Sequence, residues 1–504
     1  MKRTSLTTAV IAGIAGVAGI SNMASAVYLN NDGLGQVLIY PYYTVNGGNN
    51  TLLTVVNTTP QGKAVKVRFL EAYDSREVLD FNLYLSPQDV WTAAVVPVGA
   101  GAGVFTNDNS CTVPALPTSL ATAQPFLTYA YDGTGDTAAD GGPTGVSRTL
   151  EGYVELIEMG TVTNAAQDSL KAITHATSGS TAGIPADCSQ VVNAWNGGYW
   201  DITSGGDPTT DMAATSGGLF GSGAIINVNQ GTIAGYNADA IDQFYSDAFS
   251  HHTAPGSLSP NISSATSKVS YVFAPSPSST IPTLITTSYS SGVDAVSSLF
   301  MADKIFNEYW TAGGTAANSE WVITFPTKRF YVDSASAAAG HLAPFDKLFS
   351  KGVSCAPIGI GIYDREERTT SGTIGFSPAK VQQGASLCYE AQVVTFNQPG
   401  IATGASAVLG SNLTANISPP AGANNGWAVI DLYGKSAANH VLPAAYTDGT
   451  VGASNVFRGL PVTGFWVANL VNGNVGGVLS NYSALFRHKL HRTCALGTTT
   501  SACS

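Results

Sequence analysis

Hydrophobic and polar residues alternate along much of the chain, which is the pattern of β-strands with one buried face. In residues 63–73, Val65, Val67 and Phe69 alternate with charged side chains. Similar short runs recur, separated by turns rich in Gly, Asn and Pro. Short strands at this spacing are typical of antiparallel sandwiches, so the pattern predicts a mainly β protein with antiparallel β-sandwich, immunoglobulin-like regions.

Residues 33–59 contain two apolar runs around a Gly-Gly-Asn-Asn turn, which predicts two strands joined by that turn. Pro41 lies inside the first run and has no amide hydrogen for a central ladder position, so it favours an edge strand or a bulge. Tyr40, Tyr42 and Tyr43 beside it are expected to be packing and rim residues. We therefore expect this stretch to form a sheet edge on which another chain could pair.

The middle of the chain has a different pattern. Residues 98–150 have loop composition, and residues 164–177 permit a helix. In residues 294–310, apolar side chains fall at spacings of three and four, which predicts an amphipathic helix packed on a sheet. Strand patterns return from residue 320 to residue 489, which predicts a second β region.

The start of the chain has the pattern of a secretory signal peptide: a basic Met1-Lys2-Arg3, an apolar run and the small residues Ala24-Ser25-Ala26. We therefore expect a signal peptide at 1–26, followed by an N-terminal β-sandwich region at 27–160. A loop-rich, partly helical region at 161–315 and a C-terminal β region at 316–504 complete the predicted organisation.

Composition limits the possible partners. Charged residues make up only 11% of the chain and the net charge is −11, against roughly 25% charged residues in an average domain. Nucleic acid is not an expected partner, because its binding needs clustered Lys and Arg. Low charge weakens self-repulsion and suits close packing of subunits. We expect no transmembrane segment in the mature chain, since no later run is long and apolar enough.

Six cysteines indicate an oxidising compartment. Their number leaves many pairings open, and we predict sequential disulfides: Cys111 with Cys188, Cys355 with Cys388, and Cys494 with Cys503. No C-x-x-C redox motif is present.

Catalytic motifs are weak throughout. Ser377–Lys380 matches S-x-x-K without its companion motifs, and Gly434–Ser436 ends like a P-loop that lacks its first glycine. Two groups of carboxylates invite a glycosidase interpretation; they are Glu151, Glu155 and Glu158 on one strand, and Asp364, Glu366 and Glu367 on one turn. We expect the first group to form a solvated face and the second an exposed hairpin tip with local pairing, so the sequence predicts no catalytic residues and favours a protein without catalytic activity.

Metal sites are open hypotheses. His488, His491 and Cys494 are evenly spaced and could bind zinc if they shared a helix face, although a disulfide at Cys494 is the favoured alternative. Residues 136–141 resemble part of a calcium loop, but Ser147 stands where the bidentate Glu belongs. We predict no cofactor, with calcium as the one ion that the acidic loops could hold.

Aromatic residues offer a second hypothesis, because planar rings can stack on sugars. The candidates are Trp195, Tyr199 and Trp200 around a Gly-Gly turn, with Trp310, Trp427 and Trp466 near strands. Burial in the core is the default for such rings.

Three stretches together carry a resemblance: GLGQVLIYPYYTV with TLLTVVNTT and VLDFNLYLSP, EWVITFPTKRFYVD, and GFWVANLVNG with NYSALFRHK. They resemble uncharacterised exported proteins of Gram-negative proteobacteria that are labelled as cell surface proteins. The resemblance implies a surface location and transfers no activity and no site residues.

We therefore expect a secreted protein, exported through the inner membrane to the cell surface or the medium. Its predicted role is structural or adhesive, with a self-assembling layer or filament subunit as one form. The alternative is a secreted carbohydrate-binding or carbohydrate-degrading protein. The expected partners are accordingly further copies of the chain or a surface polysaccharide.

Overall fold

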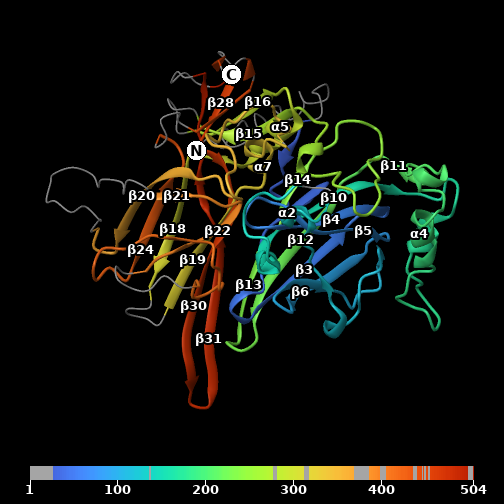
Figure 1. The fold of residues 1–504 in the computed structure, drawn as a ribbon, viewed down its shortest axis with the longest axis horizontal. Coiled ribbons are helices and arrows are strands. Elements are labelled where there is room, and N and C mark those ends of the chain that lie inside the picture. The colour runs from blue at the N-terminus through green and yellow to red at the C-terminus, as the bar shows by residue number, and fades with distance from the viewer. Residues whose placement is uncertain are drawn as a thin grey trace, which may run out of the picture.

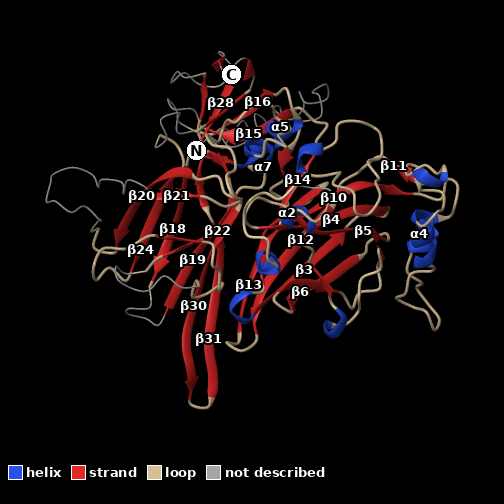
Figure 2. Cartoon of the chain, viewed as in Figure 1, coloured by secondary structure: helices blue, strands red, loops and turns tan. Residues whose placement is uncertain are grey.

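The computed structural model describes residues 26–135, 138–275, 281–311, 317–335, 337–367, 385–397, 405–434, 440–444, 446–447, 450–451, 455–497 and 503. Nearly all of the predicted signal peptide lies outside these ranges. Strands dominate the fold and the few helices lie around them (Figures 1 and 2). The protein is thus mainly β, with antiparallel sheets in a sandwich-like arrangement, as the sequence predicts.

The first sheet of the N-terminal sandwich draws strands from residues 28 to 242. Its order is β1 (Tyr28–Leu29), β14 (Asp239–Asp242), β2 (Val37–Thr44), β10 (Glu151–Val162), β4 (Gly62–Glu71), β5 (Glu77–Leu85) and β8 (Cys111–Val113), and β11 (Met212–Ala213) also pairs with β10. All of its pairings are antiparallel.

The second sheet packs against the first. Its order is β13 (Thr232–Asn237), β12 (Leu219–Asn227), β3 (Asn49–Asn57), β6 (Val90–Val98), β7 (Gly101–Phe105) and β9 (Gln124–Pro125). Alternate residues of β3 lie on opposite faces of this sheet, and the apolar face is turned inward. Leu53 and Val55 point into the core, while Leu52 is exposed. Between the sheets, the rings of Phe81 and Trp91 lie with centroids 5.8 Å apart.

The prediction that residues 33–59 form a sheet edge is wrong. Strand β2 lies between β14 and β10, and β3 lies between β12 and β6, so both are internal strands of different sheets. The turn Asn46–Gly48 carries the chain from one sheet to the other, and Gly47 and Gly48 adopt the positive φ angles that it requires. Pro41 is accommodated at a bulge, because the β2–β10 register shifts beside it.

The helical middle of the chain is small. Helices α3 (Ser169–Ile173) and α4 (Cys188–Trp195) cover a separate apolar cluster around Trp200. Short helices α2 (Tyr129–Asp132) and α7 (Arg329–Val332) lie elsewhere on the sandwiches.

The helix predicted at 294–310 is only half correct. Helix α5 (Gly292–Phe300) ends where Met301 turns extended, and β17 (Met301–Ala302) and β18 (Lys304–Trp310) follow. Ile305 and Tyr309 are four residues apart, a spacing that puts them on one face of either a helix or a strand. Both are buried from a strand, so the helical period was ambiguous there.

Two further sheets form the C-terminal sandwich. One has the order β21 (Ala385–Leu387), β20 (Ala356–Asp364), β24 (Asn425–Asp431), β18 and β32 (Lys489–His491). The other has the order β23 (Thr414–Asn416), β22 (Ala391–Thr395), β19 (Ala317–Thr324), β30 (Thr463–Val475) and β31 (Val478–Arg487), with β22 and β23 parallel. The Tyr309 and Phe396 rings stack between the two sheets at 5.3 Å.

Smaller strands surround these sheets. They are the pair β15 (Val269–Ala274) and β16 (Thr283–Ser288), the pair of β17 with β29 (Leu460–Pro461), the pair β26 (Tyr446–Thr447) and β27 (Thr450–Val451), and the sheet of β25 (Val441–Pro443), β28 (Asn455–Arg458) and β33 (Cys494–Leu496).

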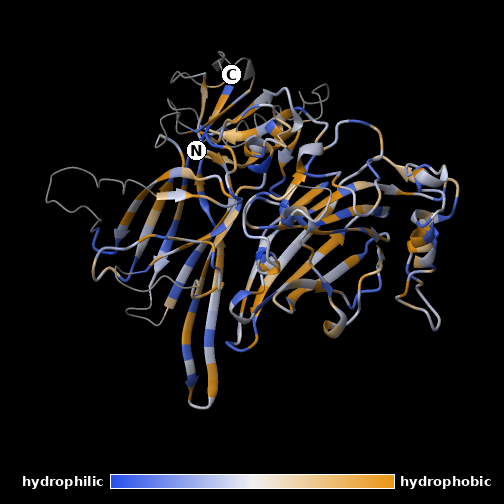
Figure 3. Ribbon diagram, viewed as in Figure 1, coloured by the Kyte–Doolittle hydropathy of each residue, from blue (hydrophilic) through white to orange (hydrophobic). Residues whose placement is uncertain are grey.

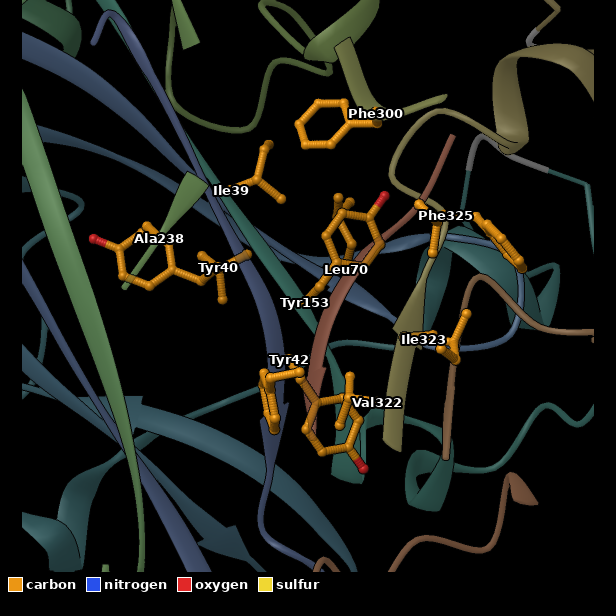
Figure 4. Packing of buried hydrophobic residues seen from close by; sticks show 14 of the residues in the cluster. Ile39, Tyr40, Tyr42, Leu70, Tyr153, Ala238, Phe300, Val322, Ile323 and Phe325 are labelled. Carbon is orange, nitrogen blue, oxygen red and sulfur yellow. The ribbon is translucent and has the colours of Figure 1, made fainter. Parts of the chain in front are cut away.

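One hydrophobic core joins the two sandwiches. Figure 4 shows Tyr42 from β2 lying near Val322 from β19. The Thr324 hydroxyl donates a hydrogen bond of 2.6 Å to the carbonyl oxygen of Pro41. The three tyrosines of β2 are fully buried and do not form a rim. Tyr42 meets Phe465 of β30 at the junction, whereas Tyr40 and Tyr43 pack inside the N-terminal sandwich.

The predicted disulfide pairing is confirmed: Cys111–Cys188, Cys355–Cys388 and Cys494–Cys503. Among the described residues, no helix combines the length and the apolar character needed to cross a membrane.

Candidate functional site

The hairpin of β30 and β31, residues 463–487, extends away from the body of the protein, and we call it the arm (Figure 1). Its base belongs to the core, because β30 is buried from Thr463 to Asn469. Beyond Val471 the side chains are largely exposed, out to the turn at Gly476 and Gly477. The arm is therefore a rigid extension of an internal sheet.

One face of the arm carries an apolar stripe. Val478, Tyr482 and Phe486 of β31 point the same way, and 64%, 60% and 58% of their surfaces are exposed. Val475, which pairs with Val478 across the turn, extends the stripe to the tip. We call these four side chains the arm stripe, and Figure 3 shows apolar residues continuing along the arm outside the body.

Aromatic contacts anchor the stripe at its base. The ring of Phe486 stacks on buried Trp466 with centroids 5.5 Å apart. Trp310 meets Trp466 edge-on at 4.9 Å. Burial was the default expectation for these rings: Trp466 is buried and Trp310 packs on it, so both support the arm.

The arm has no charged residue from Thr463 to Phe486. Exposed β-hairpins usually carry charges, especially Lys, that prevent pairing with other chains. The arm lacks this protection and has contiguous apolar side chains instead, which is the character of an interaction surface.

The outer edge of the arm contacts β13 of the N-terminal sandwich. The Ser483 hydroxyl bonds to both the amide nitrogen and the carbonyl oxygen of Ile233, and the Asn481 side chain donates to the Gln230 carbonyl at 2.7 Å. Arg487 forms an ion pair with Asp239. These side-chain contacts cover the edge of β31 and leave the stripe face free for contacts.

The first carboxylate group is buried, so the prediction of a solvated face is wrong. Glu155 pairs with Arg68 at 2.7 Å and Glu158 pairs with Lys63 at 2.7 Å. Glu151 accepts hydrogen bonds of 2.6 Å from the Tyr42 and Ser411 hydroxyls, and the sequence pattern pointed to neither as its partner. Burial raises the pKa of all three glutamates against the opposing effect of these partners, and the bonds tie strands together.

The second carboxylate group lies at the expected turn, but only two of its three side chains are exposed. Glu366 and Glu367 are exposed, and Arg365 lies 3.9 Å from Glu366. Asp364 is buried and accepts a hydrogen bond from the Glu366 amide at 3.0 Å, so it shapes the turn.

The zinc hypothesis is wrong. His488, His491 and Cys494 lie on extended chain instead of one helix face, and Cys494 is in a disulfide. His488 is buried and bonds to the Val322 carbonyl at 2.7 Å, and burial lowers its pKa to about 4. Within the described ranges, no group of three His, Cys, Asp or Glu side chains is arranged to hold a metal ion.

The other aromatic candidates are mostly packed. Trp200 is buried and stacks on Tyr84 at 5.6 Å, and Trp195 donates to the Tyr84 hydroxyl at 2.8 Å. Tyr199 packs against Trp200 edge-on. Trp427 is partly exposed and stacks on Tyr363 at 4.4 Å.

Three sequence hypotheses fall wholly or partly outside the described residues. They are Ser377–Lys380, Lys435 and Ser436 of the P-loop-like end, and Asp136 and Thr137 of the calcium-like loop.

Comparison with family models, with curated proteins and with solved structures finds no match to this chain. The sequence did not predict that the arm is exposed, because its alternating residues resemble those of any half-buried strand. The available signal was the absence of charge from Thr463 to Phe486.

Proposed function

We propose that this is an exported cell-surface protein with a structural or adhesive role, and that its copies associate through their arms. The observation that carries the proposal is the charge-free arm with its exposed apolar stripe. The signal-peptide pattern, three disulfides and the resemblance to cell surface proteins support the location.

A second copy of the chain is the occupant that fits the arm stripe. The low charge of the chain weakens repulsion between copies. The arm has no charged side chain from Thr463 to Phe486, so two arms can meet there without repulsion between side chains. A two-fold contact uses the same patch on both copies, which requires only that the stripe complement itself.

Burial of the arm stripe would favour association. Full burial of a Val or Phe side chain contributes about 1.5–3 kcal/mol. The arm stripe offers four such side chains per copy: Val475, Val478, Tyr482 and Phe486. Because the arm is already held by β13, little further ordering opposes the contact.

The test compares the purified mature protein with the variant Val478→Lys/Tyr482→Lys by analytical ultracentrifugation and negative-stain electron microscopy, with and without calcium. We expect the wild type to form dimers or larger ordered particles and the variant to be monomeric, because four lysines would meet at a two-fold contact. The matched control is Ile202→Lys/Phe249→Lys, which charges two exposed apolar residues away from the arm and should assemble as the wild type does.

A wild-type protein that stays monomeric at high concentration in both conditions would contradict the proposal. Equal assembly of the arm variant and the wild type would show that copies associate through another surface.

A further inference from the structure

A cleft of about 1120 Å³ opens where the two sandwiches meet β15. The loop after β1, the junction of β13 and β14, and residues 487–493 line it. Its volume is many times that of one water molecule, about 30 Å³. The cleft therefore has room for a ligand of several rings and not only for a small ion.

Cations gather on one wall of this cleft. Residues 487–492 read Arg-His-Lys-Leu-His-Arg, in a chain whose net charge is −11. Arg487 is neutralised by Asp239, which also accepts a hydrogen bond from Thr463. His491 is held by Asp303 at 2.7 Å. Arg492 and Lys489 remain as the cations available to a ligand, and exposed Asp32 is a carboxylate of the same lining.

Arg492 is the most informative residue of the wall. In the described part of the chain it has no carboxylate partner, and its buried Nε atom has no hydrogen-bond partner. Burial and the neighbouring Arg487 lower the pKa of Arg492 to about 10, so it stays protonated at neutral pH. A largely buried guanidinium without an anion reduces stability, which is a common property of binding residues.

The rest of the lining suits a polar ligand with rings. Asn31 and Asn237 present exposed amides, which both donate to and accept from hydroxyl groups. Phe273 also lines the cleft, with 64% of its surface exposed, and offers a flat apolar ring.

We propose that this cleft binds an acidic saccharide, whose carboxylate or sulfate group pairs with Arg492 and Lys489. The planar guanidinium matches the two oxygens of such a group. The asparagine amides would contact sugar hydroxyls, and the Phe273 ring would lie against a sugar face. This binding does not depend on assembly through the arm.

The test is isothermal titration calorimetry of the full mature protein with a panel of uronate and sulfated trisaccharides. Two further ligands are the methyl ester of each uronate trisaccharide, which has no charge, and inorganic sulfate. We expect at least one acidic trisaccharide to bind about tenfold or more tightly than its neutral counterpart or than sulfate. Arg492→Met should weaken that binding about tenfold or more, because a charge-assisted hydrogen bond is lost.

The matched control is Lys171→Met, which removes one exposed cation far from the cleft and should bind as the wild type does. The urea midpoint of Arg492→Met should equal or exceed that of the wild type, so weaker binding would not reflect unfolding. If Arg492→Met does not fold, exposed Lys489→Met provides the same comparison, and we expect it also to weaken binding.

Three results would overturn the proposal: no acidic trisaccharide binds at millimolar concentration, the neutral ester binds equally well, or sulfate alone binds as tightly as the saccharide. Unchanged binding by the cleft variants would do the same. The arm variant Val478→Lys/Tyr482→Lys should bind the saccharide normally, which separates failure of this proposal from failure of assembly.

Discussion

Replacement of Arg148 by Met tests whether a buried ionic cluster supports the N-terminal sandwich. Arg148 lies just before β10 and is buried. Its guanidinium pairs with Glu71 at 2.8 Å, with Asp140 at 2.6 Å and with Asp74. It also lies 4.3 Å from the ring centroid of Tyr131. Met retains much of the volume and removes the charge.

The expected loss at neutral pH is about 3–5 kcal/mol in the free energy of unfolding, the usual cost of breaking a buried ion pair. Glu71 would keep hydrogen bonds from the backbone amides of Tyr73 and Arg76, at 2.7 and 2.8 Å. It would nevertheless remain buried and charged. The loss comes from this carboxylate, which no cation would then neutralise.

The loss should depend on pH. Burial opposes ionisation of Glu71, but Arg148 outweighs it and lowers the pKa of Glu71. In the wild type this contributes stability that is present above the unfolded pKa of about 4.3 and is lost as the pH falls through the folded pKa. Without Arg148, burial raises that pKa, so the variant can protonate Glu71 and its deficit should shrink near pH 4.5.

The assay is urea unfolding followed by tryptophan fluorescence at about pH 7 and pH 4.5, with Lys171→Met as the control for loss of one cation. A deficit below about 1 kcal/mol at neutral pH would refute the reasoning. So would a deficit of equal size at both pH values, because it would reflect lost packing and not unpaired charge.

Three further predictions concern stability. Burial raises the pKa of Glu390 to about 8, so the folded state binds a proton that the unfolded state releases, and wild-type stability should fall by up to about 4 kcal/mol between pH 5 and 8. Glu390→Gln should make the slope measured by urea unfolding shallower, because the contribution of Glu390 is lost, and an unchanged slope would refute the assignment. Cys111→Ser/Cys188→Ser removes a disulfide that closes a loop of 77 residues. Because the unfolded chain gains the entropy of that open loop, the free energy of unfolding should fall by up to about 4.5 kcal/mol, and a loss near zero would contradict this reasoning. Gly152→Ala places a Cβ 2.0 Å from the Leu70 carbonyl oxygen, so it should lower the thermal midpoint by several degrees, and an unchanged midpoint would show that β10 can shift freely.

Local strands could be predicted from the sequence because burial of one face imposes a period of two. Leu53 and Val55 show it in β3, where they are buried and Leu52 is exposed. Strand β4 was expected to have one buried face as well, but that is wrong, because Lys66 and Arg68 are also buried and paired with carboxylates. The partners of a strand could not be predicted in the same way. Gly47 and Gly48 suit a hairpin turn as well as the crossover between sheets that they form, and sequence composition does not distinguish these two paths.

The candidate site was beyond prediction for a related reason. Tyr482 and Phe486 alternate as a buried strand would, and only the absence of a neighbouring layer exposes them. Glu158 was expected in solvent, but Lys63, 95 residues away, neutralises it in the interior. The disulfides could be predicted because each of the three joins two cysteines that are consecutive along the chain.

The continuity of β30 has a mechanical consequence. The strand that forms half of the arm is also paired with β19 from Thr463 to Leu470, deep in the C-terminal sandwich. Ladder hydrogen bonds lie perpendicular to their strands. A pull on the arm tip along its length would therefore load all of these bonds in shear at once instead of peeling them apart one by one, so tension applied to the arm would pass directly into the core.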